Sequence, residues 1–536
     1  METQTAAAPS STAVPRLRRT LSLWDLIFYG IVLIQPIAPV PLYGVAQKLS
    51  DGHFVTIILI ALFAMLITAV SYGRMGALYP TAGSAYTYVG KGLNPHLGFL
   101  AGWAMILDYL LQPLINTVWI ATALHERYVH QVPYVFWALL IAGVMTMLNL
   151  IGVKASANAN KVLLAIMTVV VAAFVILAVK YLYGGQGWAG LFSLEPVYNP
   201  RTFDAHKILT ATSFAALTYI GFDGVTTLAE DVENPKRNVL LAVVLTCIFA
   251  GVSSGIEAYL GARVWPNWHS FPNLETAYMD ICSRVGGPIL FNAMGFILIV
   301  AAFGSGLTGT LGAARLLFGM GRDGVLPKKI FGHLKPGSST PTYNILLIGG
   351  LAFVGAVLLN YIGSAYQHAG ELLNFGAFLA FMGVNAAAFW RFSVSAETGS
   401  RRPAAFLLIC FGVGALLYQL ATSILGIQRV ADFVTRLHVN VAQLLHVLNV
   451  AALGVGIVLA LMLLYVTVQT CGISFRSISD SIFPFIGFVF CGIIWVNLNW
   501  IAQTVGGIWF VIGLVYVGYK TNWFRSAPVM IDFSDQ

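Results

Sequence analysis

Three carboxylates lie deep within apolar segments of the sequence, and their type and position make them the best candidates for chemistry. Asp108 lies in the segment 97–124, Asp223 in 207–229, and Glu257 near one end of 239–262. An aspartate near the centre of a bilayer costs about 2.5–3.5 kcal/mol on insertion scales, so it normally has a partner. The middles of the first two segments contain no Lys or Arg. Asp108 and Asp223 are therefore either protonated or paired with a cation from outside the chain.

Asp223 lies in the stretch "ALTYIGFDGVTT", where Gly221 and Gly224 interrupt an otherwise apolar helix. Backbone that leaves helical geometry at membrane depth must line a cavity or be buried in protein. We expect Asp223 to meet a cationic substrate and to carry the coupling proton, with Tyr219 and Phe222 also binding substrate. The alternative is a neutral, hydrogen-bonded acid beside the helix break.

A polar stripe follows one face of the segment 97–124. Asp108, Gln112 and Asn116 recur every four residues, and Tyr109 lies at the margin of the stripe. A carboxylate beside an aromatic face suits an ammonium group, so we expect Asp108, Tyr109 and Gln112 to bind substrate. Hydrogen bonding between helices is the alternative, and it is equally weighted for Gln112 and Asn116.

A second break interrupts the first apolar segment, "GIVLIQPIAPVPLYG". Pro36, Pro39 and Pro41 lie near its middle, and each removes a backbone donor and clashes with the preceding turn. Gln35 and Ile37 are therefore further candidates for substrate contact. Breaks five helices apart are typical of inverted repeats with a binding site at the membrane midplane. Alternatively, proline and glycine are simply common in membrane helices.

The remaining polar groups have simpler interpretations. Glu257 has a plausible partner in Arg263 beyond the same helix end, so we interpret it as structural. The five cysteines show no metal-ligand spacing, and we expect no metal site and no cofactor. The inner loops contain no nucleophile with a nearby base and no phosphate-binding glycine loop, which excludes an enzyme.

Composition places the whole chain in a membrane. It is 58% hydrophobic and 9% charged, whereas about a quarter of the residues of a soluble domain are charged. We expect fourteen membrane helices at 24–47, 54–72, 97–124, 134–152, 161–183, 207–229, 239–262, 289–318, 343–361, 370–391, 404–427, 447–469, 482–498 and 500–519. Most of the 29 Lys and Arg residues fall in alternate loops, which predicts cytoplasmic N- and C-termini in a plasma (inner) membrane. This bias explains the net charge of +8 without a nucleic-acid partner.

The helix pattern divides the chain into six parts. They are a cytoplasmic tail (1–23), a first inverted repeat (24–183), a second repeat (207–391), an inserted two-helix hairpin with an outer interfacial helix (396–475), the last two helices (476–519) and a second cytoplasmic tail (520–536). We expect the hairpin to lie outside the core, facing lipid or a partner subunit of a homo-oligomer.

Four motifs resemble the amino acid–polyamine–organocation transporter family, and within it the bacterial putrescine importers. They are "YPTAGSAYTYV" at 79–89, "NPHLGFLAGW" at 94–103, "IGFDGVTTLAEDVENPKRN" at 220–238 and "ARLLFGMGRDGVLP" at 314–327. "LSLWDLIFYG", "SDGH" at 50–53 and "DYLLQPLIN" at 108–116 are similar to the putrescine branch. The resemblance implies an all-α polytopic fold with two inverted five-helix repeats, alternating access and proton-coupled uptake.

Within that family, polyamine transporters place an acid in the helix 6 break to meet an amine, and Asp223 occupies that position. Amino-acid carriers usually have a glycine-rich break in helix 1, whose amides hold the substrate carboxylate. Here the stretch is "QPIAPVP", which favours a substrate with amines and no carboxylate. The resemblance thus indicates an importer of putrescine or a related polyamine; the alternative is an amino-acid permease of the same fold. The insertion and the lack of a Lys between Val162 and Val179, where some proton-coupled relatives have one, depart from the family pattern.

Overall fold

The structure is a computed structural model, and it describes residues 20–125, 131–274, 276–335, 340–360, 365–394, 478–498, 500–526 and 528. The long helices are α3 (Phe54–Leu78), α5 (Pro95–Ala123), α6 (Tyr134–Ile151), α7 (Val153–Gln186), α11 (Pro235–Val264), α12 (Ala277–Arg322), α14 (Thr342–Leu359), α15 (Ala365–Phe389), α20 (Phe483–Val496) and α21 (Trp500–Lys520). Shorter ones are α1 (Leu23–Ile34), α2 (Tyr43–Leu49), α4 (Ala85–Gly92), α8 (Trp188–Leu191), α9 (Ala205–Ala215), η2 (Ala216–Tyr219), α10 (Gly224–Thr227), η3 (Trp268–Ser270), α13 (Lys328–Phe331), η4 (Trp390–Val394) and η5 (Ile478–Ile482).

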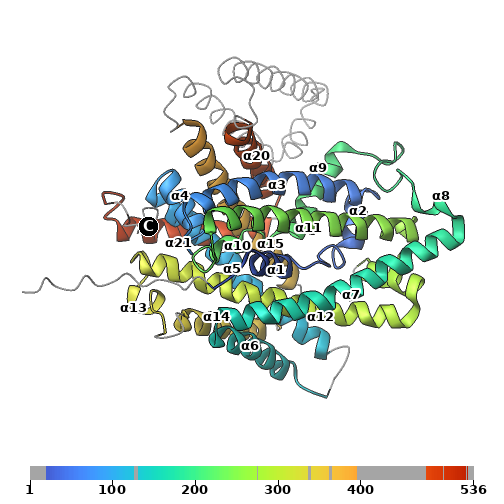
Figure 1. Ribbon diagram of the computed structural model, residues 1–536, viewed down its shortest axis with the longest axis horizontal. Coiled ribbons are helices and arrows are strands. Elements are labelled where there is room, and N and C mark those ends of the chain that lie inside the picture. The colour runs from blue at the N-terminus through green and yellow to red at the C-terminus, as the bar shows by residue number, and fades with distance from the viewer. Residues whose placement is uncertain are drawn as a thin grey trace, which may run out of the picture.

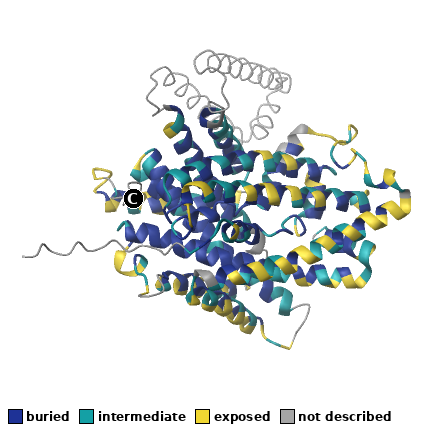
Figure 2. Cartoon of the chain, viewed as in Figure 1, coloured by how far each residue is buried: buried dark blue, intermediate teal, exposed yellow. Residues whose placement is uncertain are grey.

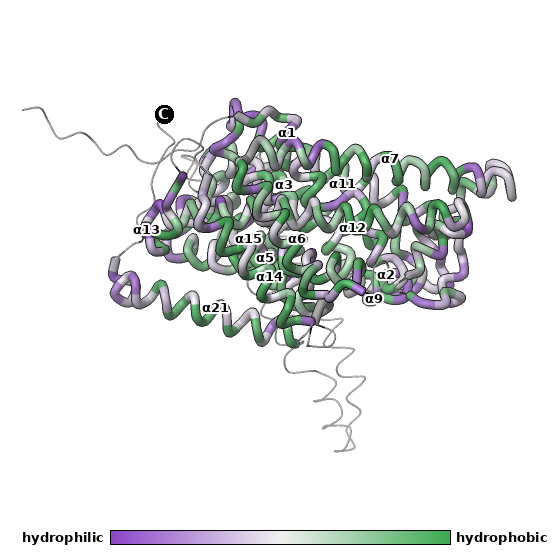
Figure 3. The backbone as a smooth tube through the Cα atoms, turned by 90° about the horizontal axis from the view of Figure 1, so that it is seen from below, coloured by the Kyte–Doolittle hydropathy of each residue, from purple (hydrophilic) through white to green (hydrophobic). Residues whose placement is uncertain are grey.

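The described part of the chain is a bundle of membrane helices. Nine of its helices are long and apolar enough to cross a membrane, and Leu23–Ile34 and Asp480–Val496 are shorter apolar helices. Many helices run along the long axis of the molecule, with α13 and the C-terminus near one end and α8 at the other (Figure 1). Hydrophobic residues occupy the middle of the bundle, and hydrophilic residues gather toward its two ends (Figure 3). The predicted all-α polytopic membrane class is therefore confirmed.

Both predicted helix breaks are present. The first apolar segment forms α1 and α2, separated by turns over residues 35–42, with Gln35 at a positive φ of 74°. The sixth forms α9, η2 and α10, and residues 220–223 between η2 and α10 are not helical. Gly221 has a φ of 120°, a left-handed conformation that a residue with a Cβ rarely adopts.

The core surrounds these two breaks. Helix α5 packs against α12, α14 and α15, while α11 packs against α3 and α1. Buried residues concentrate in this centre, and exposed residues follow the outer faces of helices such as α7 (Figure 2). Large apolar side chains are exposed on α7, α11 and α14, for example Val169, Val252 and Val354, and such side chains suit contact with lipid.

Several helix boundaries differ from the expected ones. Helix α7 begins at Val153 rather than 161, and α12 begins at Ala277 rather than 289 and kinks at Gly287, where φ is 63°. The sequence did not reveal these extensions because polar residues at helix ends weaken the apolar signal. The two helices expected at 404–427 and 447–469, and with them the hairpin 396–475, lie outside the described residues.

Candidate functional site

Asp223 lies where the sixth membrane helix is broken, immediately before α10. Its side chain is buried, with 1% of the residue exposed. The hydroxyl of Tyr109, from α5, donates a hydrogen bond of 2.8 Å to Oδ2 of Asp223. The other oxygen, Oδ1, is buried and has no hydrogen-bond partner among the described residues. Backbone groups of Gly221, Asp223 and Gly224 lie near the carboxylate, but none completes a hydrogen bond to Oδ1, so this oxygen can accept a donor from outside the chain.

The broken ends of helices 1 and 6 meet beside this carboxylate. A Cβ added to Gly224 would lie 2.2 Å from Cδ2 of Leu33, at the end of α1, and 3.3 Å from the Tyr109 hydroxyl. A Cβ on Gly221 would lie 3.0 Å from Cγ of Leu33. Both glycines therefore allow a close approach, which explains why the sequence has no larger residue on either side of Asp223.

Asp108 is a second buried carboxylate near the break. It is 2% exposed, and its Oδ1 has no hydrogen-bond partner among the described residues. Asp108 interacts electrostatically with Asp223. Helix α15 passes close by, since a Cβ on Gly376 would lie 3.1 Å from the backbone nitrogen of Asp108. The structure therefore places the two predicted acids in one buried region.

Three aromatic rings lie next to the break. Phe222 packs edge-on against Tyr72 of α3, with ring centroids 5.7 Å apart, and its ring is tilted against that of Phe381 of α15 at 5.1 Å. Tyr72 and Phe381 are 5.4 Å apart. Sequence reasoning found Phe222 and missed the other two, because an aromatic residue in an apolar helix carries no signal of the face it occupies. Aromatic faces beside a carboxylate favour a cation.

The rest of the polar stripe on α5 bonds to α12. Gln112 Nε2 donates to Ser305 Oγ at 3.1 Å, and Asn116 Nδ2 lies 3.4 Å from the same oxygen. Ser305 Oγ in turn donates to the carbonyl of Leu33 at 3.0 Å, at the end of α1. Gln112 and Asn116 thus connect to the helix 1 break through Ser305, a residue that the sequence reasoning did not identify.

The other candidate residues occupy the two breaks. Tyr219 is buried, and its hydroxyl donates to the carbonyl of Ile58 at 2.8 Å, which anchors η2 to α3. Ile37 is fully buried and Gln35 is partly buried. Pro36 and Pro39 are buried, whereas Pro41 is exposed. The structure therefore does not bring Tyr219's hydroxyl to Asp223.

The first break presents few free backbone donors. Residues 36, 39 and 41 are prolines without an N–H. The amides of residues 35, 38, 40 and 42 donate to the carbonyls of residues 31, 35, 37 and 39. That leaves only the amide of Ile37, among residues 35–42, without a backbone acceptor.

The three motifs around residues 79–89, 220–238 and 314–327 meet near the end of the bundle that carries α13. Arg322 donates to both oxygens of Glu230, at 2.9 and 2.7 Å, and Glu230 also accepts from the amide of Ala82 at 2.9 Å. Arg315 pairs with Asp231 at 3.2 Å, and both side chains are buried. Burial raises the pKa of Asp231 to about 6, although the Arg315 guanidinium opposes that rise.

Further contacts complete this end of the bundle. The amides of Thr20 and Leu21 donate to the carbonyl of Asp231 at 2.7 and 2.9 Å, which joins the segment before α1 to the end of the sixth helix. The hydroxyl of Tyr86 donates to Asp323 at 2.9 Å. Together with the buried ion pairs, these bonds join the segment before α1, the residues around the start of α4, the end of the sixth helix and the end of α12. We call the end of the bundle that these contacts hold together the closed end.

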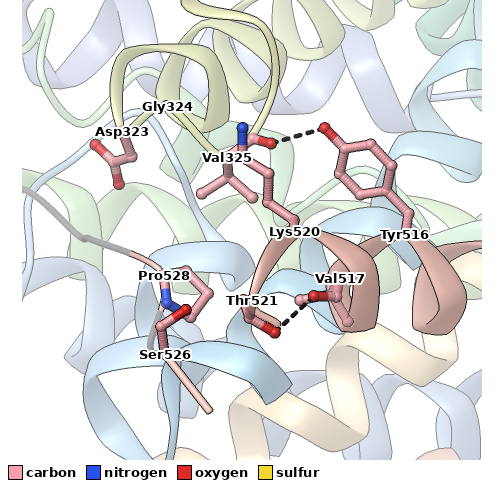
Figure 4. Close-up of a pocket in the computed structure, with 9 residues that line it drawn as sticks. All are labelled: Asp323, Gly324, Val325, Tyr516, Val517, Lys520, Thr521, Ser526 and Pro528. Carbon is pink, nitrogen blue, oxygen red and sulfur yellow. Dashed lines mark hydrogen bonds between the residues drawn. The ribbon is translucent and has the colours of Figure 1, made fainter. Parts of the chain in front are cut away.

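A separate pocket of about 180 Å³ lies between the turn after α12 and the end of α21. Figure 4 shows its lining, where the Tyr516 hydroxyl donates to the carbonyl of Val325 at 2.9 Å. None of the predicted site residues lines it. A second hollow, lined by apolar residues of α3, α7 and α11, includes exposed residues such as Leu59 and Val252. Neither hollow belongs to the Asp223 site.

The expected pairing of Glu257 with Arg263 is wrong. Arg263 Nε donates to the carbonyl of Gly190 at 3.0 Å, and Nη2 donates to that of Ala189 at 3.2 Å. The carbonyls of the segment 187–191 accept the hydrogen bonds of the guanidinium at the end of α11. Spacing along one helix could not reveal this contact, because the segment belongs to another part of the chain. Within the described ranges, no group of three or more His, Cys, Asp or Glu residues is arranged as metal ligands.

Comparisons with known proteins find similar sequences across much of the chain. The family model described as amino acid permease matches residues 21–448. The low-affinity putrescine importer PlaP of Escherichia coli is 33% identical over 377 residues, which cover 70% of this chain and 81% of the relative. The vacuolar cationic amino acid transporter 4 of Arabidopsis thaliana is 26% identical, covering 69% of this chain and 62% of the relative. The methylthioribose transporter of Bacillus subtilis is 25% identical, with coverages of 71% and 82%.

Proposed function

The chain belongs to the amino acid permease family, and we propose that it imports putrescine or a related polyamine by secondary active transport. Family membership makes it a multi-pass membrane transporter of polyamines or amino acids rather than an enzyme. The putrescine importer relative supports the choice of substrate and a location in the inner membrane.

The observation that carries this proposal is the unpartnered Oδ1 of Asp223 in a buried helix break. Burying a carboxylate without a counter-charge is costly, and a bound ammonium group offsets that cost. Tyr109 holds the other oxygen, so the carboxylate is oriented before the substrate arrives. Phe222, the residue before Asp223, packs against Tyr72 and Phe381, so aromatic rings border the break. A second ammonium group of a diamine would face Asp108.

The first break argues against a substrate that also carries a carboxylate. Helix-end amides are the usual ligands of such a group. Among residues 35–42, only the amide of Ile37 lacks a backbone acceptor, because the others are bonded or are prolines. A carboxylate near the second break would meet the like charge of Asp223. Diamines have no such group to satisfy.

Alternating access is the mechanism in this proposal. Asp223 accepts the substrate ammonium as its counter-charge, which offsets the cost of burying the carboxylate while the substrate crosses. The closed end, whose buried pairs join Glu230 with Arg322 and Asp231 with Arg315, opens to release substrate. With both termini in the cytoplasm, that end faces the cytoplasm. The hairpin 396–475 then lies at the periphery, toward lipid or a partner subunit.

The competing function is transport of a cationic amino acid, and the relative from Arabidopsis thaliana supports it. Uptake of radiolabelled putrescine, competed by unlabelled diamines and by amino acids, separates the two. We expect Asp223→Asn to abolish putrescine uptake while the protein still reaches the membrane, as measured by surface labelling. Near-normal uptake by Asp223→Asn, or competition by amino acids alone, would overturn the proposal.

A further inference from the structure

The proposed role of Asp223 does not identify the residue that carries the proton during proton-coupled import. A carboxylate whose charge is taken up by an ammonium group does not carry a proton together with the substrate. Symport therefore needs a second group that is protonated while the substrate is bound. The following inference rests on the proposed import of a cation and names that group.

Glu257 is the third deeply buried acid and lies near the C-terminal end of α11, whereas α11 begins four residues after Asp231 of the closed end. The residue is 1% exposed. Its Oε1 lies 3.2 Å from the hydroxyl oxygen of Ser253, one turn earlier, and its Oε2 is buried without a partner among the described residues. Arg263 donates elsewhere, so it does not neutralise the carboxylate.

Ser253 connects Glu257 to the break in helix 1. The Ser253 hydroxyl oxygen lies 3.3 Å from the carbonyl oxygen of Pro36, as well as 3.2 Å from Glu257 Oε1. The single hydrogen of the serine hydroxyl points to one of these two oxygens or is shared between them. A protonated Glu257 that donates to Ser253 Oγ frees the serine hydrogen for the Pro36 carbonyl, so both contacts become full hydrogen bonds. The geometry therefore fits a neutral Glu257.

The groups that face Glu257 do not provide another counter-charge. From α12, the Tyr278 hydroxyl donates to the backbone carbonyl of Glu257 at 3.2 Å, and the Cys282 thiol lies near enough to the Glu257 carboxyl to interact with it electrostatically. Tyr43 of α2 stacks edge-on against Tyr278, with centroids 5.2 Å apart. Tyrosine and cysteine are neutral near pH 7, so a charged Glu257 in this closed arrangement would be buried alone.

We propose that Glu257 is the carboxylate that binds the co-transported proton, and that Ser253 transmits its protonation state to the Pro36 carbonyl of the helix 1 break. A proton from the outer solution forms the O–H bond on Glu257, which lets α2 and α12 close over a neutral side chain. After the inner end opens, Glu257 loses that proton to the cytoplasm. The Ser253 hydrogen then turns to the carboxylate and leaves the Pro36 carbonyl free.

The test uses the full-length protein in proteoliposomes with the membrane potential clamped. Two reactions are compared: exchange of radiolabelled putrescine for unlabelled putrescine, and accumulation driven by an acidic outside. One pH unit sustains at most about a tenfold accumulation per coupled proton. We expect Glu257→Gln to keep exchange and to lose both the accumulation and the pH dependence of exchange. Glu195→Gln, a change of an exposed acid on the neighbouring loop, is the matched control and should behave as wild type.

Two results would overturn the assignment to Glu257: a Glu257→Gln protein that accumulates putrescine like wild type, or a wild-type protein that does not respond to the pH gradient. If Glu257→Gln also loses exchange, the pH profile of accumulation by Glu257→Asp tests the assignment, because this variant keeps a titratable group. Accumulation with a shifted pH profile supports the proposal, and an unshifted profile contradicts it. A wild type that exchanges arginine and not putrescine refutes the proposed substrate alone, and the same gradient test then proceeds with arginine.

Discussion

The hydroxyl of Tyr109 donates a hydrogen bond of 2.8 Å to Oδ2 of Asp223, and this bond joins the third membrane helix to the break in the sixth. It leaves Oδ1 as the oxygen without a partner. A substrate ammonium group therefore binds without displacing the tyrosine. The bond also fixes the direction in which the carboxylate presents that oxygen.

Replacing Tyr109 by Phe should weaken substrate binding. Hydrogen bonds to charged groups contribute about 1.5–3 kcal/mol, which corresponds to a rise in Km of about 10- to 150-fold. Tyr109→Leu also removes the aromatic face and should raise Km further. Putrescine uptake kinetics provide the measurement. Tyr516→Phe is the control, since its hydroxyl bonds to Val325 in the separate pocket, and it should leave Km unchanged.

Replacing Asp108 by Asn should reduce putrescine uptake, because it removes the second negative charge near Asp223 while keeping the shape of the side chain. The loss should be larger for putrescine than for a monoamine of equal length, which has no second ammonium group. Initial rates for both substrates, normalised to protein at the membrane, give the comparison. If Asp108→Asn and Tyr109→Leu both transport putrescine normally, the polar stripe serves only helix packing.

Breaking the closed end should expose the path to Asp223. Removing one partner of a buried ion pair costs about 3–5 kcal/mol, because it leaves the other charge unpaired. Arg322→Gln should therefore increase labelling of a cysteine introduced at the buried Ala229 by a thiol reagent applied from the closed end. The exposed Lys328→Gln in α13 is the matched control. Equal labelling of the two proteins would show that the Glu230–Arg322 pair does not hold this end closed.

The sequence predicted the membrane helices of the described residues and both breaks, because each has a local cause. Runs of apolar residues define the helices, Pro36 and Pro39 cannot continue one without strain, and Gly221 and Gly224 weaken one. Asp223 and Asp108 could be identified because a charge is rare in such segments.

The contacts between helices could not be predicted in the same way. Ser305, Tyr72 and Phe381 join the region of the site through packing of α12, α3 and α15, and no spacing along one helix encodes that packing. Arg263 was assigned to Glu257 because both lie near one helix end. It instead bonds to the segment after α7, which is distant in sequence.

The hairpin expected at 396–475 lies outside the described residues, and its topology can be tested by labelling. Segments 404–427 and 447–469 are each long enough to span a membrane. A cysteine at Gln428 should then react from outside, and one at Ser400 only after permeabilisation. Labelling of both from the same side would refute the hairpin and the count of fourteen helices.

The most direct test of the central claim compares two ligands that differ by one carboxylate. Ornithine is putrescine with an added carboxylate, so the comparison tests the effect of that carboxylate alone. The proline-rich break has almost no free amides that could bind it. The measurement is displacement of radiolabelled putrescine from the purified protein. We expect ornithine to compete at least about 100-fold more weakly than putrescine, a difference of about 2.7 kcal/mol, and Asp223→Asn to bind neither. Equal competition by ornithine, or full putrescine binding by Asp223→Asn, would contradict a site built for an amine without a carboxylate.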